Sequence, residues 1–367
     1  MKVIYDAQIF TEQEFGGISR YFCALATELS RIPDINVKIV APLHVNGYLR
    51  ELNPAIAVGH FIPRLPKTGR IIKALSGVFF RPVAAMMWPD IVHETYYSPR
   101  PTYGGRVQHV LTVYDMIHER FPGSFAVNDP VALYKASAVH RADHIFCISE
   151  NTRRDLLEIH GIPEERISVT YLGYDAFAAS SMTATELVGD SPYLLHVGGR
   201  QGYKNFEGLL RAYAASDWLH TNFRVVCFGG GAFSPKERGL MAELGISATQ
   251  VVQIGGADDR LAALYSSAAA FVYPSMYEGF GIPPLEAMSL GCPVICSNTS
   301  SIPEVVGEAG EYFDPADTGS IRDALERVLQ SVSRRSQLID LGYVRCRRFS
   351  WERCANETAA VYRRLAK

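Results

Sequence analysis

The sequence predicts an α/β protein built from two doubly wound parallel-sheet domains of the Rossmann type. Short runs rich in β-branched residues alternate with helical patterns along the chain, as in parallel α/β proteins. At 367 residues the chain exceeds the size at which one hydrophobic core usually stops growing, so two domains are expected. Residues 173–191 are rich in Ala, Ser, Thr and Gly with little periodicity, and we interpret them as the linker.

Each domain is expected to contain five or six strands. In the N-terminal half they are predicted at residues 2–6, 37–41, 91–94, 109–114, 144–148 and 167–171. In the C-terminal half they are predicted at residues 193–197, 224–228, 251–254, 270–273 and 293–297. A ligand is expected in a cleft between the domains, at the carboxyl ends of the strands.

The composition narrows the function classes. A hydrophobic fraction of 48%, a charged fraction of 20% and a formal net charge of −2 give no indication of a nucleic-acid partner. The seven cysteines include no CxxC pair and mostly lie in apolar runs, which favours reduced core residues in a cytosolic protein over metal or disulfide use. We expect the first residues to form a strand and not a signal peptide, because polar Asp6 and Gln8 soon follow. No window approaches the roughly 20 apolar residues of a transmembrane helix.

The first candidate ligand-binding segment is GGISRY, residues 16–21, between the first strand and a helical run over 18–29. Gly16 and Gly17 would let the backbone approach a ligand, and the helix start offers N–H groups to a phosphate. A plain tight turn explains the two glycines equally well. The segment lacks the G-x-G-x-x-G spacing of a dinucleotide site.

The second segment is LTVYDMIHERFP, residues 111–122, where Asp115 and His118 follow an apolar strand. Side chains at this position are expected at the carboxyl edge of the sheet. His118 titrates near neutrality and Asp115 could accept or orient a proton, so together they could handle an acceptor hydroxyl. A solvated loop with Asp115 as a structural cap is the alternative.

The third segment is LLHVGGRQGYKNFEGLL, residues 194–210, where a strand runs into Gly198 and Gly199. Arg200 and Lys204 stand just before an amphipathic helix, and two cations at such a turn suit a diphosphate. A pair of solvated surface cations is the alternative. No P-loop spacing occurs here, which disfavours ATP hydrolysis.

The fourth segment is FVYPSMYEGFGIPPLEAMSLGCPVICS, residues 271–297. Glu278 falls in the loop after a strand, and Glu286 falls in the first turns of a helix that the proline pair favours. The amides of Gly279 and Gly281 would point towards a bound ligand. An ionised carboxylate only accepts hydrogen bonds and matches the vicinal diol of a sugar or ribose. Alternatively, Glu286 only compensates the helix dipole.

Together these segments resemble the retaining nucleotide-sugar glycosyltransferases of the GT-B fold, family 4. The resemblance rests on the Glu278-x7-Glu286 spacing within EGFGIPPLEAMSLGCPVICS and covers nearly the whole chain. The other matching segments are GGISRY, ISENTRRDLL, VTYLGYD, HVGGRQGYKN, LYSSAAAFVYPSMYEGFG, SSIPEVVGEAG and FSWERCANETAAVYRRL. It implies an acceptor domain over 1–175 and a donor domain over 176–349, facing each other across a cleft. The final helix, 350–367, would return to the first domain with Trp351 as anchor.

The resemblance also implies roles for individual residues. Glu278 would contact the hydroxyls of the transferred sugar, and Glu286 would hold the ribose diol. Arg200 and Lys204 would neutralise the leaving diphosphate, and Gly17 would approach the phosphates. The predicted catalytic residues are Glu278, Asp115, His118, Arg200 and Lys204. The predicted donor-binding residues are Gly16, Gly17, Gly199, Arg200, Lys204, Gly229, Ile254, Glu278, Gly279, Phe280, Gly281, Ile282 and Glu286.

One position departs from the family pattern. Many relatives carry His immediately before the Asp that ends the strand, and Tyr114 stands there in this chain. Whether His118 substitutes for that His stays open.

The implied activity is retaining transfer of a hexose from a nucleotide sugar to a glycan or lipid-linked glycan in polysaccharide or O-antigen assembly. Mannose from GDP-mannose is favoured, because the segments YDMIHERFP and GYKNF look like those of polysaccharide-assembly relatives. The alternatives are a UDP-sugar-dependent glucosyl, GlcNAc or rhamnosyl transferase, a GT-B-like epimerase or phosphorylase, and a non-catalytic nucleotide-sugar-binding protein. We expect no cofactor, no metal and a cytoplasmic location.

Residues 64–88, RLPKTGRIIKALSGVFFRPVAAMMW, combine basic and large apolar side chains. Such a basic amphipathic stretch could place the enzyme peripherally on an anionic membrane, at the inner face of the plasma membrane, to reach a lipid-linked acceptor. A core helix with a solvated basic face is the alternative.

Overall fold

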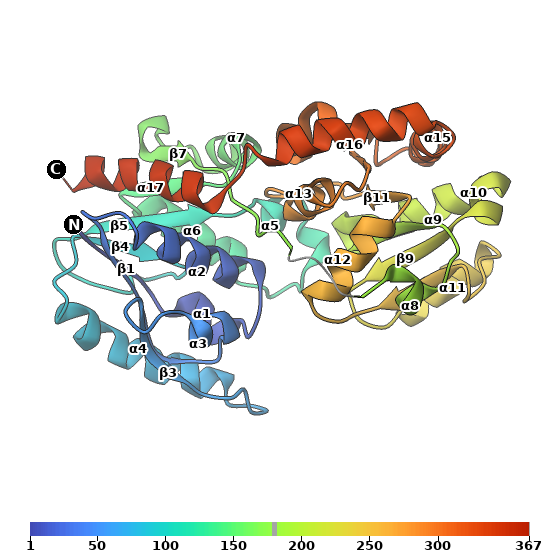
Figure 1. Cartoon of the computed structure of the whole chain (residues 1–367). Coiled ribbons are helices and arrows are strands. Elements are labelled where there is room, and N and C mark those ends of the chain that lie inside the picture. Colours follow the sequence, from blue (N-terminus) through green and yellow to red (C-terminus); the bar gives the residue numbers. More distant parts are fainter. Residues whose placement is uncertain (178–181, 367) are drawn as a thin grey trace. The chain divides into compact units, whose positions relative to one another are not determined.

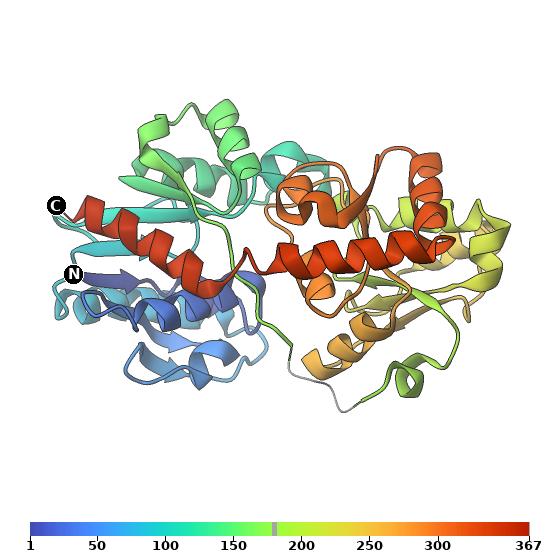
Figure 2. The same cartoon turned by 45° about the horizontal axis from the view of Figure 1, so that its top comes forward.

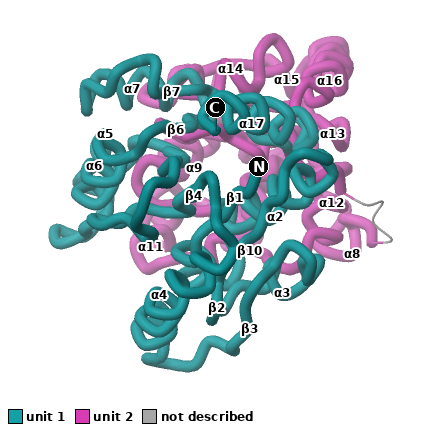
Figure 3. Tube along the Cα trace, turned by 90° about the vertical axis from the view of Figure 1, so that its left-hand side faces the viewer, with its two compact units in different colours: residues 1–173, 350–367 teal, residues 174–349 magenta. Residues whose placement is uncertain are grey.

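The computed structural model describes residues 1–177 and 182–366 of the chain. They divide into two compact units, shown in different colours in Figure 3. Unit 1 comprises residues 1–173 and 350–367, and unit 2 comprises residues 174–349. The sequence analysis placed the boundary after residue 175, close to this division.

Unit 1 contains a seven-stranded parallel sheet in the order β3-β2-β1-β4-β5-β6-β7. Its strands are β1 Lys2–Tyr5, β2 Asn36–His44, β3 Ala57–Phe61, β4 Ile91–Glu94, β5 Gln108–Val113, β6 His144–Cys147 and β7 Ile167–Val169. Its helices are α1 Gln8–Glu12, α2 Gly17–Leu29, α3 Gly47–Glu51, α4 Gly69–Ala85, α5 Ile117–Arg120, α6 Val131–Arg141, α7 Glu150–His160 and α17 Trp351–Leu365.

Unit 2 contains a six-stranded parallel sheet in the order β10-β9-β8-β11-β12-β13. Its strands are β8 Tyr193–Val197, β9 Arg224–Phe228, β10 Val251–Ile254, β11 Ala270–Tyr273, β12 Val294–Ser297 and β13 Gly310–Phe313. Its helices are α8 Ala184–Val188, α9 Phe206–Ala214, α10 Asp217–Asn222, α11 Pro235–Glu243, α12 Asp258–Ser267, α13 Ile282–Ser289, α14 Ile302–Val306, α15 Thr318–Leu329 and α16 Val332–Cys346. The predicted α/β class with two doubly wound parallel sheets is confirmed.

The sequence analysis missed one strand in each sheet, β3 and β13, and both lie at a sheet edge. The strand β3 reads AVGHF and includes Gly59, and β13 reads GEYF and begins with Gly310. An edge strand has one neighbour, so it tolerates glycine and polar residues that weaken a strand pattern. The sequence pattern therefore did not indicate the two edge strands.

The predicted linker, residues 173–191, is partly helical. Helix α8 lies within it and starts with a capping box, in which the Thr183 hydroxyl accepts from Glu186 N at 3.4 Å. The carboxylate of Glu186 accepts from Thr183 N at 2.9 Å. Ala184 and Val188 are buried in this five-residue helix, which is too short to show a period. Residues 178–181 of the predicted linker lie outside the described residues.

Neighbouring residues of β1 face opposite layers of unit 1. Ile4 packs with Phe80 of α4, while the Tyr5 ring lies 4.9 Å from the Phe22 ring of α2. Since side chains alternate along a strand, α2 and α4 cover opposite faces of the sheet. Figures 1 and 3 show α4 on the face away from α2 and α17.

Helix α17 completes the α2 face of unit 1 and lies along α2 (Figure 2). The hydroxyl of Tyr362 lies 2.6 Å from Nδ1 of His93, and His93 Nε2 lies 2.8 Å from the Thr112 hydroxyl. Burial lowers the pKa of His93 to about 3, so the imidazole stays neutral at pH 7. Near its start, the Trp351 backbone leaves no room for a Cβ on Gly173, at 2.2 Å.

In unit 2, β8 and β11 are the central pair of strands. Leu194 of β8 and Val272 of β11 belong to a core that includes α9 and α15. On the other face, Phe271 of β11 meets Tyr265 of α12 at 5.5 Å between ring centres. Strand β11 is thus fixed from two sides, and because β8 and β11 are parallel neighbours their following loops begin side by side.

We predict that Tyr362→Phe lowers the free energy of unfolding of unit 1 by about 1–3 kcal/mol, because buried His93 loses a hydrogen-bond partner. Urea unfolding together with hydrogen exchange of α17 would measure the change. Arg363→Ala is the control, because it removes only an exposed ion pair to Asp34 and should change little. Equal effects of the two substitutions would contradict the role of the buried bond.

Candidate active site

The loops after β8 and β11 meet in an ion pair. Lys204 ends a short 3-10 turn, Gly202–Lys204, after β8, and Glu278 follows β11. The Lys204 Nζ atom lies 2.7 Å from Glu278 Oε1 and 2.9 Å from Oε2. The side chains are 25% and 10% exposed, so the pair is largely shielded from water. The structure therefore brings together two residues that the sequence analysis placed in separate roles.

Two serines after β12 fix the backbone of the Glu278 loop. The Ser300 hydroxyl accepts from Glu278 N at 2.8 Å and donates to Glu278 O at 2.7 Å. The Ser301 hydroxyl lies 2.9 Å from Glu278 O and from Phe280 O. Ser300 has φ 57°, a left-handed conformation that a non-glycine residue adopts only when its surroundings hold it there.

Sequence reasoning missed Ser300 and Ser301. Both lie in SSIPEVVGEAG, which was one of the segments that carried the family resemblance. That segment was the available signal, but a hydroxyl that holds a distant loop has no local sequence pattern.

Helix α13 begins directly after this loop, with Gly281 as N-cap at φ 108° and two prolines in the first turn. Glu286 lies inside the helix and is buried, and the Tyr265 hydroxyl donates to its Oε2 at 3.4 Å. Burial and the Glu286 carboxylate raise the pKa of Tyr265 well above its usual 10. Burial and the Glu278 carboxylate do the same to the pKa of Tyr273. Both predicted glutamates are therefore buried carboxylates beside tyrosines that remain protonated.

Arg200 points to a different neighbour from the one expected. The sequence analysis grouped it with Lys204, but its Nε donates to Glu237 at 2.6 Å. Its Nη atoms donate to the carbonyls of Gly229 at 3.0 Å and Gly231 at 2.9 Å. The side chain is 2% exposed. Arg200 thus anchors the loop after β9, and the two cations do not stand as a pair.

Glu237, to which the sequence analysis gave no role, is the carboxylate that accepts from Arg200. It also closes the capping box of α11, because its Oε2 accepts from Ser234 N at 2.6 Å. Burial acts to raise the pKa of Glu237, but the bonds from Arg200 and Ser234 outweigh it and lower the pKa. Glu237 therefore stays ionised and holds Arg200 in place.

The predicted donor-binding residues Gly229 and Ile254 lie at the carboxyl ends of β9 and β10, with Gly229 N donating to Ile254 O at 3.0 Å. The next residue, Gly230, has φ 69°, and a Cβ there would come within 2.5 Å of Arg200 Nη1. This glycine therefore allows the close contact with Arg200. Gly199 follows Gly198, which has φ 105°, at the end of β8.

Two of the predicted residues of unit 1, Asp115 and His118, lie after β5. Asp115 Oδ1 accepts from Ile117 N, the first N–H of α5, at 3.0 Å. His118 stacks on Phe125 at 3.8 Å between ring centres, and burial, followed by the charge of Lys135, lowers its pKa. Fully buried Lys135, which the sequence analysis did not assign, donates to Asp115 O at 2.8 Å.

Tyr114, at the position where many relatives carry His, is buried, and its hydroxyl donates to Thr95 O at 2.8 Å. Gly16 and Gly17 stand at the start of α2 as predicted for the glycine turn. A Cβ on Gly17 would meet nothing within 4 Å, so its backbone borders open space in unit 1.

In residues 1–177 and 182–366, no group of three or more His, Cys, Asp or Glu side chains is arranged to hold a metal ion.

We predict that Lys204→Ala lowers the free energy of unfolding of unit 2 by about 1–3 kcal/mol, because it leaves the Glu278 carboxylate buried without its partner. This loss in the free energy of unfolding is smaller than expected for a fully buried pair, because Lys204 is partly exposed. A double-mutant cycle with Glu278→Gln, followed by thermal unfolding, would measure the coupling. Additive effects of the two substitutions would contradict an energetically coupled pair.

Comparisons with known proteins agree with this architecture. The family model described as Glycosyl transferases group 1 matches residues 162–345, and the model of Glycosyltransferase Family 4 matches residues 15–176. O-antigen chain mannosyltransferase B of Escherichia coli is 31% identical over 75% of this chain and 76% of its own length. The serotype-specific mannosyltransferase WbdA of Escherichia coli is 31% identical over 63% of this chain, which spans only 30% of WbdA.

Among solved structures, Anabaena Alr3699/HepE in complex with UDP and glucose is similar, with a TM-score of 0.75 and 16% sequence identity. The match covers 99% of this chain and 100% of HepE. At this identity the likeness concerns the fold, and with the two parallel sheets it confirms the predicted GT-B class. The chain belongs to the group 1 glycosyltransferases of family 4.

Proposed function

We propose that this protein is a retaining glycosyltransferase that transfers mannose from GDP-mannose to a glycan or lipid-linked glycan in cell-surface polysaccharide assembly. The observation that carries the proposal is the shielded Lys204–Glu278 pair, held by Ser300 and Ser301 at the start of α13. The choice of mannose follows the names of the O-antigen chain mannosyltransferase and WbdA.

The donor is assigned to unit 2 by the chemistry of its loops. Glu278 accepts hydrogen bonds from the hydroxyls of the transferred sugar, and Glu286 accepts from the ribose diol. Lys204 lies between Glu278 and the diphosphate and compensates the charge of both. The amides from Gly279 to Ile282, where α13 begins, donate to sugar and phosphate oxygens.

Arg200 acts indirectly in this proposal. Its bonds to Glu237 and to the carbonyls of Gly229 and Gly231 support the loop beside the nucleotide. It is a positioning residue, and Lys204 is the cation that meets the diphosphate.

Retention is proposed through attack from the face of the departing diphosphate, which helps to deprotonate the acceptor. A double displacement needs a carboxylate nucleophile, but Glu278 is paired with Lys204 and Glu286 is directed to Tyr265. Lys204 and the start of α13 supply positive charge to the leaving group, so the proposed reaction uses no metal ion.

We predict that Glu278→Gln lowers turnover with GDP-mannose by about 10²–10³-fold and changes GDP affinity by less than about threefold. The reason is that Glu278 meets the reacting sugar and not the nucleotide. Glu286→Gln is the matched variant, and it should weaken GDP binding by about tenfold through loss of a charged acceptor for the ribose. Transfer assays and calorimetric titration with GDP would measure both effects.

Thermal shift with GDP, UDP, ADP and their sugars tests the donor itself. Stabilisation by GDP and GDP-mannose alone is expected. Stabilisation by UDP-sugars alone would overturn the choice of donor, and no shift with any nucleotide would overturn the proposed activity.

We also propose that α4 seats the enzyme on an anionic membrane. Ile72, Phe80 and Ala84 point into unit 1, but a second apolar stripe is exposed. Val78 is 68% exposed, Met86 is 80% exposed, and the stripe also includes Ile71, Leu75 and Phe79. The alternative of a core helix with a solvated basic face does not explain this second stripe. No helix in the described part of the chain has the length and hydropathy needed to span a bilayer.

We predict that the protein co-sediments with phosphatidylglycerol-containing vesicles at about 0.05 M NaCl and largely detaches at about 0.5 M NaCl. Phe79→Asp should abolish binding because it places a charge in the apolar stripe. Val344→Asp is the control, because it changes an apolar residue of unit 2 that is also exposed, 65% against 50% for Phe79. Vesicle binding that resists both salt and Phe79→Asp would contradict attachment to an anionic membrane through α4.

A further inference from the structure

Unit 1 contains a pocket of about 450 Å³ that the proposed donor chemistry does not use. One side is formed by α4, through Lys73, Ala74, Val78 and Arg81, and the other by residues 6–11 and 98–102. The pocket therefore lies against the helix that carries the exposed apolar stripe.

Positive charge dominates the exposed side chains of this pocket. In the described part of the chain, Arg81 and Arg100 have no carboxylate at ion-pair distance. Lys73 forms an ion pair with Glu12. Two arginines that line one concave site without a protein counter-ion suit an anionic ligand, and the planar guanidinium suits a phosphate.

The one acidic side chain in the lining, Asp6, is already covered by donors. Its Oδ1 accepts from Thr95 N at 3.0 Å and from the Thr95 hydroxyl at 2.6 Å. Its Oδ2 accepts from Gln8 Nε2 at 2.8 Å. Asp6 therefore organises the first loop, and in the described part of the chain its carboxylate forms no ion pair with the two arginines.

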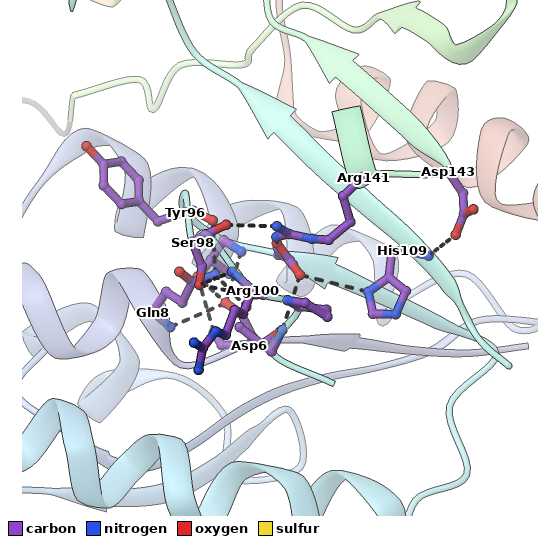
Figure 4. Close-up of polar contacts among 12 residues, drawn as sticks. Asp6, Gln8, Tyr96, Ser98, Arg100, His109, Arg141 and Asp143 are labelled. Carbon is purple, nitrogen blue, oxygen red and sulfur yellow. Dashed lines mark hydrogen bonds and ion pairs between the residues drawn. The ribbon is translucent and has the colours of Figure 1, made fainter. Parts of the chain in front are cut away.

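A buried ion pair fixes the loop that carries Arg100 (Figure 4). Arg141 pairs with Glu94 and donates to Ser98 O at 2.8 Å, and Glu94 Oε1 accepts from Thr102 N at 3.3 Å. Both ends of residues 98–102 are thus tied to Glu94 and Arg141. Arg81 adds a bond from Nε to Thr102 O at 3.1 Å.

The pocket also has an apolar side. Ala74 and Val78 line it, and Val78 belongs to the exposed stripe of α4. A small anion would use the arginines but not this surface. A phosphate that carries an apolar chain would use both, with the chain lying along α4.

We propose that this pocket binds a phosphate ester with an apolar substituent, namely the phosphate or diphosphate of a lipid-carried acceptor, through Arg81 and Arg100. The inference rests on the proposed transferase function and names its acceptor class. Glu94 and Arg141 are positioning residues for the loop. The glycan that receives the new sugar extends from the phosphate that the two arginines hold.

Farnesyl diphosphate is a soluble probe of this chemistry, with farnesol and inorganic diphosphate as its two halves. Calorimetric titration of the full chain should show farnesyl diphosphate binding at least about tenfold more tightly than either half. Arg100→Ala should weaken farnesyl diphosphate binding by about tenfold or more, and Arg100→Lys should recover part of the loss. Farnesol or inorganic diphosphate binding as tightly as farnesyl diphosphate would overturn the proposal.

Arg106→Ala is the matched control, because Arg106 is an exposed arginine of the same unit outside the pocket lining. Arg100 is the first choice for substitution, since Arg81 also supports the loop carbonyls and its removal could displace the loop. Equal losses for Arg100→Ala and Arg106→Ala would overturn the proposal, because they would indicate only general charge attraction.

Two further measurements separate this pocket from the donor site. GDP should not compete with farnesyl diphosphate, and Lys204→Ala should leave farnesyl diphosphate binding unchanged. Competition by GDP would place the diphosphate at the donor site and overturn the inference. If the unmodified protein binds GDP but not farnesyl diphosphate, only the acceptor class is rejected. If it does not bind GDP, the transferase function itself is rejected.

Discussion

The ion pair between Lys204 and Glu278 is the contact on which the site in unit 2 depends. Removing two charges from water is unfavourable, and each partner is tolerated in its shielded position because the other is there. The pair therefore ties the loop after β8 to the loop after β11, and Ser300 and Ser301 add the loop after β12. The strands β8, β11 and β12 are neighbours in the parallel sheet. The loops that follow them therefore meet at the same edge of the sheet, although they lie far apart in the sequence. In the proposed reaction Lys204 is the cation that meets the diphosphate, and in this structure Glu278 compensates its charge.

Much of the fold could be predicted from the sequence, and the parts that could not be share a physical cause. Central strands such as β8 and β11 are buried on both faces and appear as continuous apolar runs. The edge strands β3 and β13 and the short helix α8 depend on one neighbour or a few contacts, so their sequences carry little pattern. The family resemblance predicted Glu278 and Lys204 as site residues, but it did not pair them. They lie 74 positions apart, and only the register of two sheet strands brings them together.

Arg200 illustrates the limit of motif reasoning about charge. An arginine after a glycine pair at the end of a strand is expected to meet a ligand, since most arginines keep the guanidinium in water. Here the loop after β9 turns back over the guanidinium, and Glu237 with the carbonyls of Gly229 and Gly231 takes its donors. The glycines permit this approach, but nothing near Arg200 in the sequence indicates it. Asp115 in unit 1 also forms a local bond, because its Oδ1 accepts from Ile117 N.

Helix α4 presents three separate surfaces because 3.6 residues complete each turn. Ile72 and Phe80 lie eight positions apart and face the sheet. Val78 belongs to the exposed apolar stripe and also lines the pocket. Arg81 borders the same pocket from a third side of the helix. A helix needs one apolar face to fold onto a sheet, so the exposed stripe adds nothing to the core of unit 1. Because the stripe and the arginine share one rigid helix, a chain lying along the stripe would bring an attached phosphate to a fixed position beside the pocket. Membrane attachment and phosphate recognition would then both follow from the way in which side chains are distributed around α4.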